Sequence, residues 1–258
     1  MKSMWQIYDD LIASIPEDLT VKDCLVGVNW TLVRSRTTGT AMTMENGMGA
    51  VRNCGALIGM PVKELAEYVK SWNNLEACMG LAAINSVYNT VERLEELTKK
   101  SLAQQPQESA FQTFREEIKG KKVAVIGHFP GLEELEAWCS LSVLERNPQP
   151  GDFPDPACEY ILPEQDYVFI TSTTLINKTL PRLLEISRPA RVIMVGPSTP
   201  LHPVLFNNGV DTLAGSVVDD DKVWTYVRQG GLGQRIFKQG CHMVKVHKSD
   251  LSLNELNV

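Results

Sequence analysis

The sequence predicts a mixed α/β protein in two parts, an N-terminal α+β domain over 1–105 and a doubly wound parallel-sheet domain over 106–258. Near-continuous apolar strands alternate with helical segments in the second half, which is typical of a parallel sheet covered on both faces. A strand, a glycine turn and a helix follow one another at 121–132, KKVAVIGHFPGL. The composition changes abruptly to charged and amide residues at 92–109, and this change places the boundary.

The stretch at 121–132 begins the predicted sheet. Its apolar run, 123–127, is closed by His128, Phe129, Pro130 and Gly131, which indicates a buried strand that runs into a turn. Open parallel sheets bind ligands beyond the carboxyl ends of their strands. His128 is therefore the first candidate site residue.

Further apolar segments extend this sheet. The expected strands cover 140–145, 166–171, 190–195 and 212–218, with a last strand at 241–247; helices are expected at 111–119, 132–139, 175–187 and 220–229. The strands predict an open sheet whose polar strand ends lie along one edge.

The first half predicts helices around a small hairpin. An amphipathic helix ends near Ile15, a long or bulged strand covers 21–35, and a short strand follows at 41–44. Helices are expected at 62–72 and 75–90, and the second is almost entirely apolar. The glycine-dotted loop at 46–59 is either functional or an ordinary surface loop.

Composition excludes several classes of partner. A net charge of −6 without long basic runs gives no reason to expect nucleic acid or anionic membrane as a partner. The N-terminal segment lacks the uninterrupted apolar core of a signal peptide, and the chain has no stretch long enough to span a membrane. The six cysteines are scattered without CxxC pairs, so reduced thiols and a cytoplasmic location are expected.

The glycine turn argues against a dinucleotide. Glu145 lies 18 residues beyond Gly127, close to the spacing of the acidic residue that holds a ribose. However, GHFPG lacks the full GxGxxG pattern, and Pro130 removes a backbone donor that would face a pyrophosphate. NAD and FAD are therefore disfavoured as cofactors.

Two other polar groups are candidates for ligand binding. Thr171, Thr173 and Thr174 follow the third strand and, with Asn177, form either an anion site or an ordinary helix cap. Asn85 and Asn89 share one stripe of the apolar helix. These amides either cap neighbouring backbone groups or line a polar cleft.

The sequence carries no signature of a preformed metal site. CHMVKVH at 241–247 cannot chelate one ion, because Cys241 and His247 lie ~20 Å apart on a strand and His242 points to the opposite face. A site assembled from separate loops, such as His128 with Glu145 or a cysteine, stays open, and the metal is undetermined.

Four stretches carry a resemblance to a known family. GHFPGLEELE, ERNPQPGDFPDPACEYILPEQDYVFITSTTLINKT, VGPSTPLHP and GLAAINSVYN resemble the uncharacterised "putative heavy-metal chelation" proteins. The resemblance implies an N-terminal domain similar to the enolase N-terminal domain, a Rossmann-like second domain and an active site in the cleft between them. The implied cleft residues are Asn85, Asn89, His128, Glu145, Thr171, Thr173, Asn177, Pro197, Ser198 and Thr199.

Together these observations predict a protein that binds a small anionic or heterocyclic ligand, with metal chelates among the candidates. His128 is expected to act as the acid/base or ligand residue and Glu145 as a hydroxyl or metal acceptor. A nucleotide- or S-adenosylmethionine-dependent transferase and a non-enzymatic metal-carrying module are the alternatives. The substrate, the reaction and the oligomeric state stay open.

Overall fold

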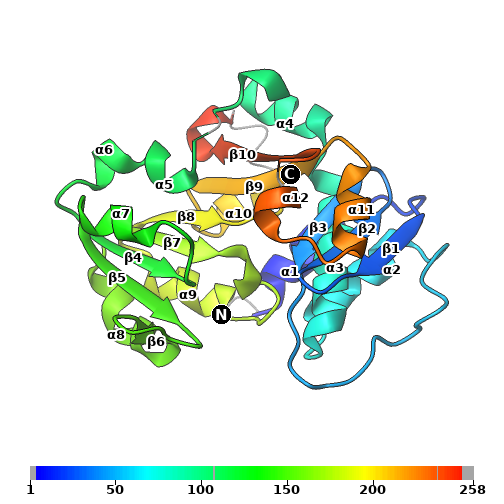
Figure 1. Cartoon of the computed structure of the whole chain (residues 1–258), viewed down its shortest axis with the longest axis horizontal. Coiled ribbons are helices and arrows are strands. Elements are labelled where there is room, and N and C mark those ends of the chain that lie inside the picture. The colour runs from blue at the N-terminus through cyan, green and yellow to red at the C-terminus, as the bar shows by residue number, and fades with distance from the viewer. Residues whose placement is uncertain (1–3, 107, 237, 252–258) are drawn as a thin grey trace.

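The protein contains two sheets and a set of short helices around them (Figure 1). The computed structural model describes residues 4–106, 108–236 and 238–251. A three-stranded antiparallel sheet has the order β1-β2-β3, and a seven-stranded sheet has the order β10-β9-β8-β7-β4-β5-β6. The predicted α/β fold class is confirmed.

The seven-stranded sheet is parallel except for β10, which pairs antiparallel with β9. Its strands are β4 (Lys122–Ile126), β5 (Ser140–Glu145), β6 (Phe153–Pro154), β7 (Tyr167–Thr171), β8 (Arg191–Val195), β9 (Thr212–Val218) and β10 (Cys241–His247). The chain runs outward from β4 to β6, returns to β7 on the other side of β4, and runs outward again to β9. The strand order therefore reverses between β4 and β7, where such sheets bind ligands.

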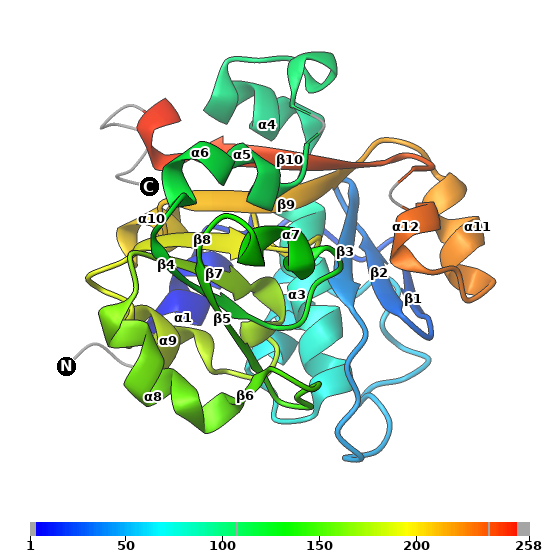
Figure 2. The same ribbon diagram turned by 60° about the vertical axis from the view of Figure 1, so that its left-hand side comes forward.

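Successive side chains of the central strands enter two different cores, so both faces of the sheet are covered. Val123 and Val125 pack with Phe114 on one face, whereas Ala124 and Ile126 belong to the larger core on the other. The first face carries α5 (Ala110–Thr113), α6 (Arg115–Ile118) and α7 (Leu132–Glu136); the second carries α8 (Cys158–Ile161), α9 (Leu180–Ile186), α10 (Pro203–Asn207) and α1 (Gln6–Ala13), as Figure 2 shows from a second side.

The small sheet packs against the longest helix. Its strands are β1 (Asp23–Val26), β2 (Trp30–Arg34) and β3 (Thr38–Met42), and its helices are α2 (Val62–Ala66), α3 (Asn74–Tyr88) and α4 (Val91–Thr98). A Cβ on Gly39 of β3 would lie 2.1 Å from the Ala82 carbonyl oxygen of α3, so only glycine permits this approach. The segment after β9 adds α11 (Lys222–Arg228) and α12 (Gly233–Ile236) beside β2.

Several expected boundaries are wrong. The single strand over 21–35 is two strands, because the chain reverses where the Gly27 N–H donates to the Trp30 carbonyl at 2.9 Å. Strand 41–44 is β3, which begins at Thr38. The helix expected at 175–187 is only α9; Lys178, with a φ of +65°, separates it from a 3-10 turn at Ser172–Thr174.

Other expected helices are shorter or divided. The segment 62–72 is α2 followed by a 3-10 turn at Glu67–Lys70, the segment 111–119 is α5 and α6, and α7 covers only part of 132–139. The other 3-10 turns are Leu102–Gln104, Asp155–Ala157, Leu162–Glu164 and Lys248–Asp250. The N-terminal helix is α1, and positions 1–3 of the expected helical stretch lie outside the described residues.

The large core joins the two halves of the chain. Tyr8 and Leu11 of α1 and Ala82 of α3 belong to the same buried cluster as Ile126 and Val168 of the seven-stranded sheet. The Tyr8 hydroxyl also donates to the Leu175 carbonyl at 3.1 Å. Among the described helices, none has the length and apolar character needed to cross a bilayer.

Candidate functional site

The site begins where β4 and β7 end beside each other. Gly127 follows β4 with a φ of +98°, and its N–H donates to the Leu144 carbonyl at 2.9 Å. A Cβ at Gly127 would lie 3.2 Å from the Thr171 Cγ2 atom, so the two strand ends are in close contact. This glycine turns the chain at the reversal point of the sheet and presents His128.

The His128 side chain pairs with Asp152. Nδ1 of the imidazole lies 3.0 Å from Oδ2 and 3.3 Å from Oδ1 of the carboxylate. The Asp152 side chain is 5% exposed, whereas that of His128 is 31% exposed. A carboxylate beside Nδ1 favours the tautomer with the proton there, which leaves the Nε2 lone pair for a proton or a ligand.

Glu145 holds the turn that presents His128. Oε2 accepts the His128 backbone N–H at 3.0 Å, and Oε1 accepts the backbone N–H groups of Arg146 at 2.8 Å and Asn147 at 3.1 Å. Its carboxylate thus bridges the chain segments that follow β4 and β5. Glu145 has the geometry of a positioning residue, although a carboxylate can accept further hydrogen bonds.

Asp152 is the site residue that sequence reasoning missed. It lies 24 residues from His128 and directly precedes β6, and its Oδ2 also accepts the Gln149 N–H at 2.9 Å. The available signal was its place in the turn-forming stretch PGDFPDP, which follows the strand that ends at Glu145. β6 contains only two residues, too few for a recognisable strand pattern.

The helix after His128 differs from a phosphate-binding helix. α7 is five residues long, and its first turn carries Glu133 and Glu134. Negative side chains at a helix N-terminus occupy the place that an anion would take. The surroundings of His128 therefore favour a neutral or cationic group over a pyrophosphate.

The threonine turn after β7 satisfies its hydroxyl groups locally. Thr171 Oγ1 lies 3.0 Å from Thr173 Oγ1, and the Thr174 hydroxyl donates to the Thr171 carbonyl at 2.6 Å. Oδ1 of Asn177 accepts the N–H and the hydroxyl of Thr179. These contacts are those of a local capping turn.

Asn85 of α3 and Asn89, the residue that caps its C-terminus, bind backbone carbonyls of both sheets. Asn85 Nδ2 donates to the Thr40 carbonyl at 2.8 Å and the Ser198 carbonyl at 2.9 Å. Asn89 Nδ2 donates to the Thr199 and Ser216 carbonyls at 2.9 and 3.0 Å. Both side chains are fully buried, so their amides join the two sheets.

The turn after β8 also contributes to this contact between the two sheets, which we call the joint. Ser198 Oγ accepts the Met42 N–H at 2.8 Å, and the Pro197 carbonyl accepts the hydroxyls of Thr40 at 3.2 Å and Ser216 at 2.9 Å. Thr199 is completely buried. The predicted site residues thus fall into three sets: His128 with Glu145 at the strand ends, the threonine turn with Asn177 after β7, and the residues at the joint between the sheets.

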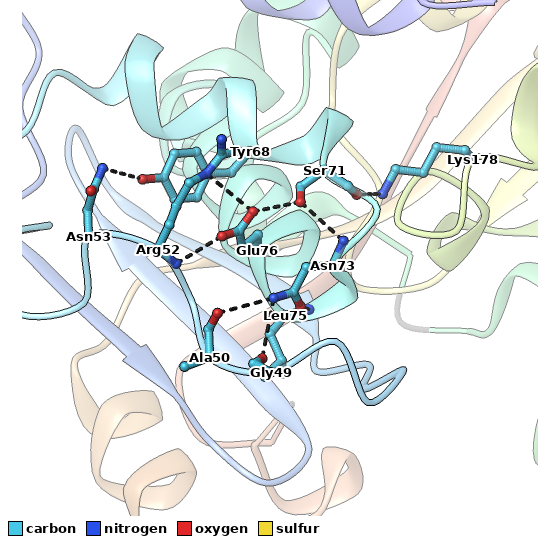
Figure 3. A network of polar contacts seen from close by, with 10 residues as sticks. All are labelled: Gly49, Ala50, Arg52, Asn53, Tyr68, Ser71, Asn73, Leu75, Glu76 and Lys178. Atoms are coloured by element: carbon cyan, nitrogen blue, oxygen red, sulfur yellow. Dashed lines mark hydrogen bonds and ion pairs between the residues drawn. The ribbon is translucent and has the colours of Figure 1, made fainter.

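A buried lysine marks a second contact between the halves. Nζ of Lys178, from the segment after β7, donates to the Ser71 carbonyl (Figure 3). It also donates to the Ile176 carbonyl at 2.5 Å. Burial lowers its pKa to about 8. The sequence places Lys178 inside an expected helix, and nothing in that pattern indicates its left-handed backbone or its buried contacts.

The same network fixes the glycine-dotted loop. Glu76 of α3 accepts the Ser71 hydroxyl at 2.6 Å and the Arg52 backbone N–H at 2.9 Å, and it pairs with the Arg52 Nε at 3.2 Å (Figure 3). Asn53 Nδ2 donates to the Tyr68 hydroxyl at 2.9 Å. The segment around Arg52 and Asn53 is therefore held against α3.

The His128 site contributes a single oriented imidazole toward a metal. Within residues 4–106, 108–236 and 238–251, no three His, Cys, Asp or Glu side chains are grouped so that they could hold an ion. The residues present thus fit a group that brings most of its own ligands better than a bare ion.

The fold and this site define a class: a Rossmann-like α/β protein with a candidate small-molecule site at its strand reversal point. Two family signatures match residues 8–88 and 109–246, and both are described as "putative heavy-metal chelation". The chain belongs to this family, as the four sequence stretches predicted.

Similar proteins match nearly the whole length of the chain. An uncharacterised protein of Methanocaldococcus jannaschii is 29% identical over 237 residues, which cover 85% of this chain and 87% of that protein. A crystal structure of a protein with unknown function from Desulfitobacterium hafniense is 40% identical with a TM-score of 0.86, covering 96% of this chain and 100% of that one. A second, from Pyrococcus horikoshii, is 21% identical with a TM-score of 0.76, covers 95% of this chain and 99% of that one, and shows the fold alone.

Proposed function

We propose that the protein binds a small metal chelate or a related heterocyclic compound at the carboxyl edge of the seven-stranded sheet, with His128 as the contacting residue. The observation that carries this proposal is the His128–Asp152 pair at the point where the strand order reverses. The family's description as heavy-metal chelation proteins supports the same class of ligand.

The His128–Asp152 pair supports this role because it orients the lone pair of the His128 Nε2 atom. The nearly buried Asp152 carboxylate holds the Nδ1 proton, and Nε2 is the ring atom that can reach a ligand. An imidazole fixed in this way coordinates a metal or accepts a proton. Glu145 contributes by holding the His128 backbone N–H.

A chelate fits better than a free ion because the site offers one ligand. A compound that already supplies several donors to its metal needs only one further position, and an oriented imidazole can fill it. The glutamates in the first turn of α7 add negative charge close to the same loop. This charge favours a chelate that carries net positive charge or none.

A nucleotide- or S-adenosylmethionine-dependent transferase is the second candidate. The order β6-β5-β4-β7-β8-β9 is that of a Rossmann sheet, and Glu145 ends the strand that carries the ribose-binding acid in such proteins. Three backbone N–H groups already occupy the Glu145 carboxylate, so this function is less well supported. A non-enzymatic metal-carrying role would use the same His128 contact.

The experiment measures chelate binding at a known histidine. The untagged chain is titrated with Cu(II)–iminodiacetate, a complex that leaves positions open for an imidazole, and binding is followed by calorimetry. His128→Ala should remove the tightest binding event. Asp152→Asn should weaken that event by about tenfold, since second-sphere carboxylates commonly contribute 10 to 100-fold to metal affinity.

His242 provides the matched control. Its Nε2 lies 3.0 Å from Asp219 Oδ2, and both side chains are 37% exposed, so it is another histidine–aspartate pair at the surface. His242→Ala should leave the tightest event unchanged. Equal affinity of the wild-type chain and the His128→Ala variant would refute the proposal, whereas binding of S-adenosylmethionine or ATP that requires Glu145 would favour the transferase.

A further inference from the structure

A pocket on the N-terminal half, separate from the His128 site, contains two thiols. It has a volume of about 310 Å³ and lies between β1, the loop around Cys54 and helix α3. Its walls are formed by Cys24, Leu25, Val26, Val51, Cys54, Gly55, Leu57, Ile58 and Met79. The only heteroatoms in these side chains are the sulfur atoms of two cysteines and one methionine.

We propose that Cys24 and Cys54 form a binding site for a soft, thiophilic metal ion of the Cu(I) class, with the Met79 thioether in the same pocket. Thiolate and thioether sulfurs select Cu(I) and similar soft ions over ions that prefer oxygen. The proposal concerns a site that is independent of the strand-end site and of its ligand.

The two cysteines come from segments that the fold brings together. Cys24 lies on β1, where it shares a face with Val26, while Leu25 between them packs into the cluster around Trp224. Cys54, from the neighbouring loop, lines the same pocket as Cys24. Both cysteines are free in the structure.

The loop that carries Cys54 is anchored on both sides of its turn. Arg52 pairs with Glu76, and Asn53 donates to Tyr68, as Figure 3 shows. On the other side Leu57 is buried. Cys54 itself is exposed, so an ion can reach it from solvent while its backbone stays next to the pocket.

The donor set favours an ion that accepts few ligands. Zinc in structural sites needs four N, O or S ligands, and within the described parts of the chain no three His, Cys, Asp or Glu side chains are arranged so that they could hold an ion. Cu(I) is stable with two thiolates. On binding, each thiol loses its proton to the buffer as a sulfur–copper bond forms, so two protons are released and the copper stays in the Cu(I) state.

The experiment uses the untagged, reduced full chain under argon and the coloured Cu(I)–bicinchoninate complex as the probe. The wild-type chain should remove one Cu(I) per molecule from the complex. Cys24→Ser and Cys54→Ser should each weaken this binding by at least about 100-fold, because each removes a direct ligand. Bound Cu(I) should also protect Cys54 from alkylation, read by mass spectrometry.

Cys139 is the matched control, since it is a half-buried cysteine outside the pocket whose sulfur donates to the Leu135 carbonyl. Cys139→Ser should bind Cu(I) as the wild type does. Cys54 is exposed in a turn, and Cys54→Ser should keep the thermal midpoint, so its loss of copper is not a loss of fold.

Wild-type copper affinity in the Cys54→Ser variant would overturn the proposal. So would a chain that takes up no Cu(I) and instead forms a Cys24–Cys54 disulfide, seen as a mass decrease of two hydrogens that dithiothreitol reverses. This experiment does not use Cu(II)–iminodiacetate, the probe of the His128 site, so a negative result here leaves the His128 proposal intact. The His128→Ala variant should still bind Cu(I).

Discussion

Replacing Asn89 by alanine should destabilise the whole protein, because this side chain satisfies three buried backbone groups. It donates to the Thr199 and Ser216 carbonyls and accepts the Leu201 N–H at 2.9 Å. Each buried group left without a partner costs about 1–3 kcal/mol, so the loss of three partners in Asn89→Ala should lower the free energy of unfolding by about 3–9 kcal/mol. Urea denaturation followed by far-ultraviolet circular dichroism measures this loss.

Asn208 provides the comparison. Its Nδ2 makes one hydrogen bond, to the Val204 carbonyl at 2.7 Å, in a half-buried position. Asn208→Ala should therefore cost only about 1 kcal/mol. A loss below about 1 kcal/mol for Asn89→Ala would refute the structural role of Asn89, and a loss of chelate binding at unchanged stability would instead identify Asn89 as a ligand-lining residue.

Three further predictions concern single side chains. His202 is buried and caps α10 by accepting the Val204 N–H, and burial, followed by the charge of Arg93, lowers its pKa to about 4. The unfolded chain takes up a proton below pH 6.5 and the folded chain does not until about pH 4, so this histidine should cost about 2 kcal/mol of stability at pH 5 and nothing at pH 8. His202→Asn, which keeps a capping oxygen, should remove that difference between urea titrations at the two pH values; an unchanged pH dependence would contradict the assignment. Gly39→Ala should cost about 3 kcal/mol or more in the same assay, since its Cβ meets a carbonyl oxygen at 2.1 Å, and a near-neutral effect would show that β3 and α3 can separate. Glu145→Ala should weaken binding of Cu(II)–iminodiacetate by about tenfold without lowering the thermal midpoint, because His128 loses the acceptor of its backbone N–H, and unchanged affinity would show that the turn holds its shape without it.

The sequence predicted the sheet well because its signal is local. The apolar run at 123–127 is continuous and supplies the four buried residues of β4, and strands of this kind need both faces covered. The position of His128 followed from the same run. The alternation of strands and helices also predicted that polar residues would collect at one edge of the sheet.

The sequence could not predict the contacts that are made over long distances along the chain. Three of the four carbonyl groups that bind Asn85 and Asn89 belong to Ser198, Thr199 and Ser216, more than 100 positions away in the second half. For that reason the sequence could not decide whether the two asparagines on this face of the helix cap backbone groups or line a cleft. Asp152 was missed because β6 is too short for a pattern, and the reversal at Gly27 was missed because the flanking residues are apolar and β-branched.

The joint between the sheets limits how the protein can admit a ligand. Asn85, Asn89 and Ser198 bind across it through buried hydrogen bonds, and the large core continues from α1 into the seven-stranded sheet. A hinge opening would have to break these contacts together, at a cost comparable to the stability of a whole domain. We therefore expect the two halves to move as one rigid body. A ligand must then reach His128 from the side of the short segments that follow β4 and β5, where the imidazole is already partly exposed. Because the Glu145 carboxylate holds the backbone of both segments, one side chain determines the shape of the surface that the ligand meets.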